Sequence, residues 1–163
     1  MRSQVQNMNP NPMMNPRALV TNRLNGAQKM ELYKSCTEGR LSDFIQLIER
    51  KGYPILEEIS AKNFNWSSLS YSLHYGKLEI VDYIMTYLQR EGKLEAVMKL
   101  KTSDGRSPLL CLLRSSNINS EVKKKMFVTL CNKFRLEIDP EVKNELKGRK
   151  IDDVLAQLTY LPH

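Results

Sequence analysis

The segment of residues 67–88, SSLSYSLHYGKLEIVDYIMTYL, constrains the fold of this chain more than any other feature. Its second half places Ile80, Val81 and Ile84 on one face at helical spacing, and Gly76 interrupts the pattern ahead of them. The segment therefore predicts two short helices joined by a tight turn at residues 75–77. We expect Gly76 to end the first helix in the left-handed backbone conformation, which a β-carbon penalises.

The same pattern occurs upstream and, in altered form, downstream. Gly39 falls where Gly76 falls, because ELYKSCTEGRLSDFIQLI (31–48) lies over SLSYSLHYGKLEIVDYIM (68–85) at an offset of 37 residues. The extra residues lie at 53–60, where Pro54 can start another short helix, and residues 91–100 predict an inserted helical turn.

A third unit opens at Thr102 with the run SDGRSPLL (103–110). Asp104 and Gly105 predict a tight hairpin turn, Ser107 can cap the helix that follows, and Pro108 suits the first turn of that helix. The loop SSNINS (115–120) replaces the glycine turn of this unit.

These units resemble ankyrin repeats, which open with a threonine-proline-leucine-histidine motif, turn at a glycine and begin a second helix with leucine and valine. The block GKLEIV (76–81) and the run SDGRSPLL carry the resemblance, which covers residues 30–158 as three to four divergent units. Ser70 and Leu110 stand where the family has histidine. A worn fourth unit begins at Gly148, with GRKIDDVLAQL as its surviving first helix. The resemblance implies an all-α fold, a short ankyrin-like solenoid with hairpin loops, whose units stack and present a binding surface.

The N-terminal segment differs in composition from the rest of the chain. Residues 1–27 hold six asparagines, three prolines, three arginines and no acidic residue. They predict an extended or disordered arm ahead of a repeat domain at 28–163, with a mitochondrial leader as an alternative. The chain carries a net charge of +7, three widely spaced cysteines and no apolar run long enough for a membrane span. These features favour an intracellular protein of the cytoplasm or nucleus.

The resemblance also implies which side chains line a concave groove and contact a partner. They are the residues beside the hairpin turn and the two residues before the glycine turn of each unit. In the second unit these are Asn63, Phe64, Trp66, His74 and Tyr75; in the third, Asp104, Arg106 and Arg114; in the first, Lys29, Thr37 and Glu38. Large rings are favoured anchors of interfaces. The alternative is that Phe64 and Trp66 fold under the inserted helices at 55–59 or 92–100 as core residues.

Basic residues of the C-terminal half suggest a second kind of partner. Lys123, Lys124 and Lys125 are expected on the solvated face of their helix, opposite an apolar face that includes Val122 and Met126. If they contact phosphates, the patch can extend to Lys133, Arg135, Lys147, Arg149 and Lys150.

Signatures of catalysis are missing from the sequence. The two histidines, His74 and His163, lie far apart, no phosphate-binding glycine loop occurs, and the neighbouring acids Asp152 and Asp153 point in different directions on a helix. Cys36 and Cys131 are expected to be packed rather than reactive. The sequence therefore predicts a protein without cofactor, metal or small-molecule substrate, an adaptor or structural subunit of a larger assembly. The alternative is a basic accessory protein of a nucleic-acid complex.

Overall fold

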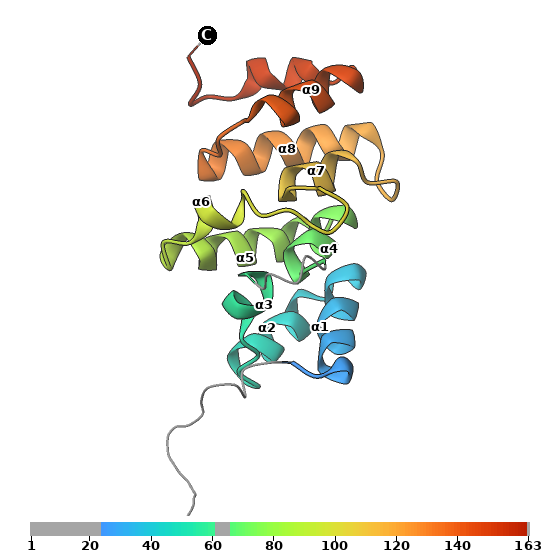
Figure 1. Cartoon of the computed structure of the whole chain (residues 1–163), viewed down its shortest axis with the longest axis vertical. Helices are drawn as coiled ribbons and strands as arrows, with labels where there is room; N and C mark the ends of the chain where they lie inside the picture. The colour runs from blue at the N-terminus through green and yellow to red at the C-terminus, as the bar shows by residue number, and fades with distance from the viewer. Residues whose placement is uncertain (1–23, 61–65, 163) are drawn as a thin grey trace, which may run out of the picture.

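The computed structural model describes residues 24–60 and 66–162, and all regular structure in these residues is helical (Figure 1). The predicted arm, residues 1–27, lies outside the described residues except for its last four positions. Asn63, Phe64 and His163 also lie outside them. The helices are α1 (Gly26–Glu38), α2 (Leu41–Glu49), α3 (Ile55–Ser60), α4 (Ser68–His74), α5 (Leu78–Arg90), α6 (Leu94–Val97), α7 (Pro108–Leu113), α8 (Ser120–Phe134), α9 (Pro140–Gly148) and the 3-10 helix η2 (Asp152–Gln157). The all-α class is confirmed for this part of the chain.

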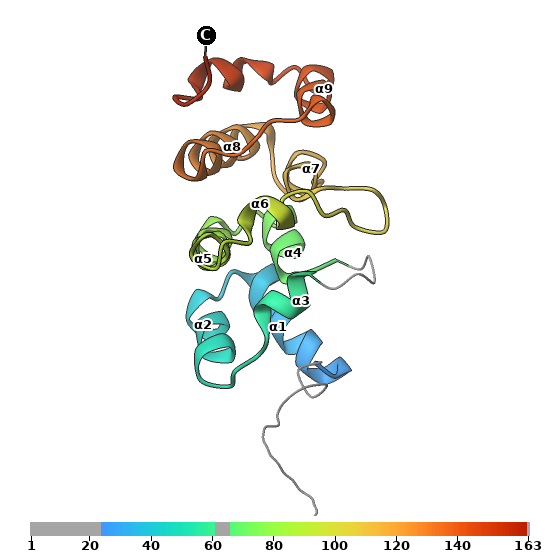
Figure 2. The same ribbon diagram turned by 60° about the vertical axis from the view of Figure 1, so that its left-hand side comes forward.

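Eight of the described helices form four pairs that are stacked in chain order along the long axis of the molecule, and α3 and α6 stand outside these pairs. The first helices of the pairs, α1, α4, α7 and α9, contact one another in succession, and so do the second helices, α2, α5, α8 and η2. Figure 2 shows the two rows, which we call the first-helix column and the second-helix column. Their facing sides bury one apolar core that runs the length of the stack and includes Phe44 and Phe127.

Three of the four pairs share the same turn, with one residue in the left-handed conformation. This residue is Gly39 (φ 71°) in the first pair, Gly76 (φ 70°) in the second and Lys150 (φ 60°) in the fourth. In each turn the amide of the left-handed residue bonds to a carbonyl three residues back, and the next amide bonds to one five residues back. This arrangement satisfies carbonyls that the end of the first helix leaves without partners. The predicted turns at Gly39 and Gly76 are therefore confirmed.

The fourth unit differs from its prediction. Its first helix is α9, which starts at Pro140 behind the capping side chain of Asp139, whose carboxylate accepts from the amide of Val142 at 2.8 Å. The predicted first helix, residues 148–158, instead contains the turn and η2, which is the second helix of the pair. The sequence misplaced this unit because its turn uses Lys150 in place of glycine.

Short sequence signals correctly predicted most of the remaining helices and turns. Pro54 precedes α3, Gly105 (φ 81°) forms the predicted hairpin turn, and α6 occupies the predicted insertion. At α7 Pro108 takes the first helical position, but the Ser107 hydroxyl makes no capping bond and is buried without a partner among the described residues. Helix α1 begins at Gly26 behind a capping box of Asn25 and Gln28, two residues before the predicted domain start.

Candidate functional site

Aromatic rings gather where α4 meets the segment that leads into it. The ring of Trp66 lies 5.4 Å from that of Tyr71 and 4.9 Å from that of His74, and the rings of His74 and Tyr75 lie 5.3 Å apart. The contacts between Trp66 and His74 and between His74 and Tyr75 are edge-to-face, an arrangement that aromatic quadrupoles favour. We call these four residues the aromatic cluster.

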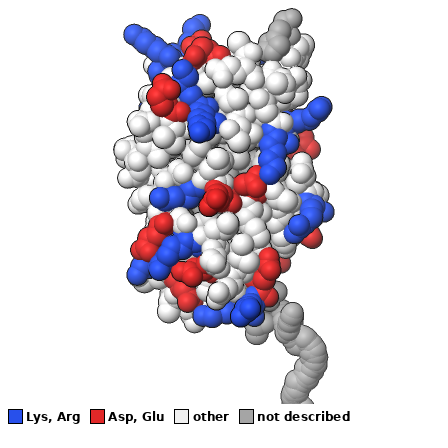
Figure 3. Space-filling model, turned by 180° about the vertical axis from the view of Figure 1, so that it is seen from behind, with Lys and Arg blue, Asp and Glu red and all other residues white. Residues whose placement is uncertain are grey.

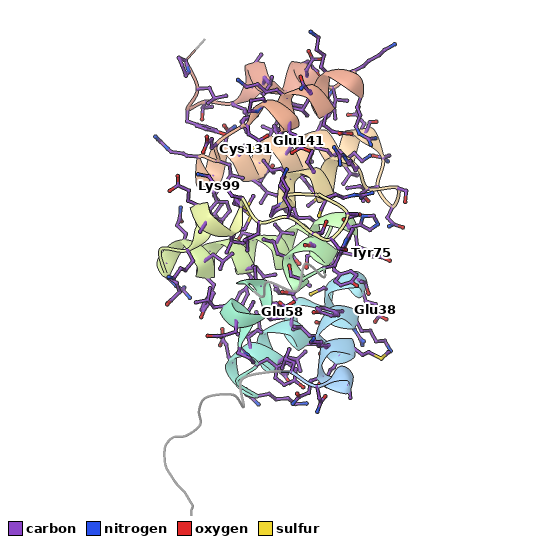
Figure 4. All side chains as sticks on the ribbon, in the orientation of Figure 1. Glu38, Glu58, Tyr75, Lys99, Cys131 and Glu141 are labelled. Atoms are coloured by element: carbon purple, nitrogen blue, oxygen red, sulfur yellow. The ribbon has the colours of Figure 1, made fainter. Side chains whose placement is uncertain are left out.

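The aromatic cluster is partly buried in the fold and partly exposed to solvent. Trp66, Tyr71 and His74 are half-buried, and Tyr75 keeps 37% of its surface exposed. The sequence left open whether Trp66 is an exposed groove residue or a core residue, and its exposure lies between these two alternatives. The cluster lies at the edge of the first-helix column where Tyr75 is seen in Figure 4, above Glu38 at the end of α1.

The hairpin turn of the third unit adds charged groups to the cluster. The guanidinium carbon of Arg106 lies 5.8 Å from the centre of the Trp66 ring, within the range of a cation–π contact. Arg106 also pairs with Asp104 at 3.1 Å. A hydrogen bond from the Thr102 hydroxyl and the charge of Arg106 lower the pKa of Asp104, so its carboxylate stays ionised. Four predicted partner-binding residues, Trp66, His74, Asp104 and Arg106, are thus brought together, with Tyr75 beside His74.

A partly buried carboxylate supports the cluster. Glu58 of α3 accepts hydrogen bonds from the Tyr33 hydroxyl (3.0 Å), the Ser68 amide (2.9 Å) and the Ser68 hydroxyl (2.7 Å). The ring of Tyr33 in turn lies 4.8 Å from that of Tyr71. Burial raises the pKa of Glu58 despite these bonds. Glu58 and Tyr33 were not predicted as part of this site, because the network joins residues that lie 10 and 25 positions apart in the chain.

His74 is held in the neutral form by its surroundings. Burial, and then the nearby charge of Arg106, lower the pKa of its imidazole. Its Nδ1 atom is buried and has no hydrogen-bond partner among the described residues. Its backbone carbonyl accepts a hydrogen bond from the Ser115 hydroxyl, which connects α4 to the loop after α7. His74 therefore contributes a neutral ring rather than a charge at neutral pH.

Arg114, the remaining predicted partner-binding residue, belongs to a different environment. Its Nε atom donates to Glu145 Oε1 at 2.8 Å, and Arg149 Nε donates to Glu145 Oε2 at 2.7 Å. A hollow of about 500 Å3 opens beside them between α7 and α9. It is lined by Arg114, Glu141, Asn144, Glu145, Gly148 and Arg149. We call this region the charged end of the first-helix column.

The proposed lysine patch is not continuous. Lys123 has only 6% of its surface exposed, Lys124 pairs with Asp153 at 3.1 Å, and Lys125 is exposed. The prediction that all three lysines lie on a solvated face was wrong for Lys123, because α8 turns that side chain toward the stack, whereas Val122 is exposed. Lys133 and Arg149 pair with Asp82 and Glu145. The face seen in Figure 3 likewise interleaves basic and acidic side chains.

The three cysteines are buried, as predicted for Cys36 and Cys131. Burial raises the pKa of the Cys36 and Cys131 thiols to about 12 and that of Cys111 to about 11. Thiols with such values are protonated at neutral pH and are poor nucleophiles. Within the described residues no group of three histidine, cysteine or acidic side chains is placed to hold a metal ion.

The described helices include none that is long and apolar enough to cross a membrane. Comparisons of the chain with protein-family models, with curated proteins and with solved structures found no match. The resemblance to ankyrin repeats thus rests on the sequence pattern alone.

Proposed function

We propose that this chain is a non-catalytic adaptor or structural subunit that binds a protein partner along its first-helix column, as a divergent ankyrin-like solenoid. The aromatic cluster and the hairpin turn with Asp104 and Arg106 form the central part of the binding surface. Arg114 extends this surface toward α9. The stacking of first helices on first helices and second on second supports the solenoid assignment, since repeat proteins bury their cores between neighbouring units.

The aromatic cluster is the observation that carries the proposal. Four ring side chains contact one another in succession at one edge of the column, and Tyr75 remains exposed. Rings of this kind bury a large area on binding and lose little conformational entropy, which makes them the usual anchors of protein interfaces. Rings held by their neighbours before binding reduce the ordering cost further.

The chemistry of the described side chains also supports a binding role. The thiols are buried and protonated, and His74 is neutral with its Nδ1 atom unpartnered. Asp153 of the adjacent acidic pair is engaged by Lys124. Covalent catalysis requires an accessible nucleophile beside a base, whereas the Ser68 hydroxyl, which lies 2.7 Å from the Glu58 carboxylate at the aromatic cluster, belongs to a fully buried serine.

The alternative function, association with nucleic acid, is less well supported by the arrangement of charge. Lys124, Lys133 and Arg149 are each paired with a carboxylate, so fewer cations are free for phosphate contacts. Binding to nucleic acid would weaken steeply with added salt, because phosphate contacts release counterions. A salt-tolerant complex with a protein is what the adaptor proposal predicts.

Isolation of the tagged full-length chain from its source, followed by identification of the co-purified protein, supplies the partner for a test. The affinity of that partner is then measured for the wild type, for Tyr75→Ala and for Tyr87→Ala. Tyr87 is a partly buried tyrosine of α5 in the second-helix column and serves as the matched control. We expect Tyr75→Ala to weaken binding about tenfold or more and Tyr87→Ala to leave it unchanged. Equal affinities of both variants and the wild type would reject the proposed surface.

A further inference from the structure

The first helix of the stack begins at the one Asn-Gly pair in the sequence, Asn25-Gly26. Asn25 is the N-cap residue of α1, and Gly26 is the first residue of that helix. Both residues are exposed to solvent. The side chain of an asparagine can be attacked by the backbone amide of the next residue, and glycine has no β-carbon to shield that amide. The pair therefore combines a reactive sequence with an accessible position.

The capping box polarises the side chain that would be attacked. Asn25 Oδ1 accepts a hydrogen bond from the Gln28 amide at 2.8 Å, and the Gln28 side chain accepts one from the Asn25 amide at 2.9 Å. A donor at a carbonyl oxygen stabilises the negative charge that develops there when a nucleophile adds to the carbonyl carbon. The Gly26 amide takes part in neither bond, and the first amides of a helix have no acceptor within the helix. The cap thus leaves the nucleophile unengaged by α1 and activates its target.

A second asparagine cap in the chain has the same geometry without the glycine. Asn119 is the exposed N-cap residue of α8, with φ −84° and ψ 173° against φ −80° and ψ 177° for Asn25. Its side chain accepts from the Val122 amide at 2.9 Å. Ser120 follows Asn119, so a β-carbon stands beside the amide that would attack. The two caps differ mainly in the residue that carries the nucleophile.

We propose that Asn25 is a deamidation site, at which the N-cap of α1 is converted into aspartate and isoaspartate. The Gly26 nitrogen loses its proton to hydroxide and bonds to Asn25 Cγ, and the side-chain nitrogen leaves as ammonia, which gives a cyclic imide. Water then opens the imide at either of its two carbonyls. One opening gives aspartate and the other gives isoaspartate. The sum consumes water, releases ammonia and involves no oxidation, and it does not depend on the proposed binding function.

The two products affect α1 in opposite ways. Aspartate keeps a side-chain oxygen for the Gln28 amide and adds a negative charge at the N-terminus of the helix, which the helix dipole favours. Isoaspartate adds a methylene group to the main chain. The Asn25 carbonyl, which accepts from the Lys29 amide at 3.0 Å, then becomes part of a free carboxylate. The isoaspartate form therefore loses the capping box and frays the start of the first-helix column.

The test incubates the full-length chain in mildly alkaline buffer made with heavy-oxygen water, so that only residues hydrolysed during the incubation carry the label. Peptide mapping by mass spectrometry follows Asn25 and Asn119 in the wild type and in Gly26→Ala. A β-carbon at Gly26 would meet nothing within 4 Å, so this variant keeps the fold, which a thermal denaturation curve verifies. The same incubation in urea gives the reactivity of the unfolded chain.

We expect labelled aspartate and isoaspartate at Asn25 of the folded wild type, little label at Asn119, and loss of the Asn25 products in Gly26→Ala. Asn25→Asp, which reproduces one product, should be at least as stable to urea as the wild type, whereas the purified isoaspartate form should be less stable. No label at Asn25 of the folded chain would overturn the site, and a label there only in urea would show that the fold protects the cap. Equal labelling of Asn25 in the wild type and in Gly26→Ala would overturn the attack by the Gly26 amide.

Discussion

Two regions of the first-helix column use the same backbone and different chemistry: the region of the aromatic cluster at α4, which we call the aromatic end, and the charged end at α7 and α9. Around α4 the surface is made of neutral rings that contact one another, with Trp66 at their centre. Around α7 and α9 it is made of charged groups, with Glu145 between Arg114 and Arg149. One repeat geometry can thus present an apolar anchor and an ionic site a few helices apart.

The comparison shows two ways of fixing a side chain at a surface. The rings are positioned by close packing and by the hydrogen bonds of the partly buried Glu58, which do not depend on ionic strength to first order. The guanidinium groups are positioned by partly exposed ion pairs, which dissolved salt screens. The aromatic end should therefore be rigid under all ionic conditions, and the charged end should loosen as salt rises.

The largest expected effect on the free energy of unfolding concerns the contact between the turn after α4 and the loop after α7, which joins the aromatic end to the charged end. A β-carbon at Gly76 would lie 2.6 Å from Ile118 Cγ2 in the loop after α7, whereas one at Gly39 would meet only the flexible Lys77 side chain at 2.8 Å. Both glycines have positive φ. We expect Gly76→Ala to lower the free energy of unfolding by about 2–4 kcal/mol, the sum of backbone strain and overpacking. Gly39→Ala should cost about 1 kcal/mol.

Chemical denaturation of both variants measures this difference, and the added change Ile118→Ala identifies its cause. Removing the Ile118 branch should restore part of the stability of Gly76→Ala but none of that of Gly39→Ala. Equal losses in the two glycine variants would mean that the joint does not pack as described.

The next largest effect tests the packing of the aromatic end. Trp66→Ala should lower the free energy of unfolding by about 2 kcal/mol, less than the 3–5 kcal/mol of a fully buried aromatic residue, because Trp66 is only half-buried. The loss should be the same at low and high sodium chloride. A loss that changes strongly with salt would show that the Arg106 contact, rather than ring packing, holds Trp66.

A smaller effect with the opposite salt response is expected at the charged end. Arg114→Met keeps the length of the side chain and removes its ion pair with Glu145, which should cost about 1 kcal/mol at low salt. Because salt screens the pair in the wild type, the difference between wild type and variant should shrink as sodium chloride rises. Denaturation curves at several salt concentrations decide this, and a constant difference would argue against an electrostatic role.

The smallest effect is a pH dependence at His74. Its pKa is lowered in the folded state, so protonation opposes folding. The stability from the neutral imidazole is fully present above the unfolded pKa of about 6.5 and is lost as pH falls below it. The stability of the wild type relative to His74→Phe should therefore decrease on acidification. Comparison of the two proteins cancels the contribution of Glu58, and parallel pH curves would contradict the assignment.

Local signals predicted much of the fold because the responsible residues stand next to one another in the chain. Gly39, Gly76 and the Asp104-Gly105 pair each located a turn, and Pro108 located the start of a helix. The fourth unit was predicted at the wrong residues because Lys150 adopts the left-handed backbone conformation, which glycine adopts far more often than lysine. Propensity describes what a residue prefers, and tertiary packing can override it.

The site was predictable only where the repeat pattern places residues on one edge. The resemblance to ankyrin repeats predicted partner-binding roles for five residues that the structure brings together: Trp66, His74, Tyr75, Asp104 and Arg106. It also named Arg114, which pairs with Glu145 instead. Glu58 was not predicted, and Lys123 was wrongly predicted on the solvated face, since the environments of both are created by elements that lie far away in the sequence.

The central claim is that a protein partner binds along the first-helix column, and hydrogen exchange of the full chain with and without that partner tests it most directly. The account predicts that binding slows amide exchange in α4, in the hairpin turn at 102–106 and in the first helices α7 and α9. Exchange in the second helices α5 and α8 should change little. Protection confined to α5 and α8, or no protection in α4, would contradict the claim.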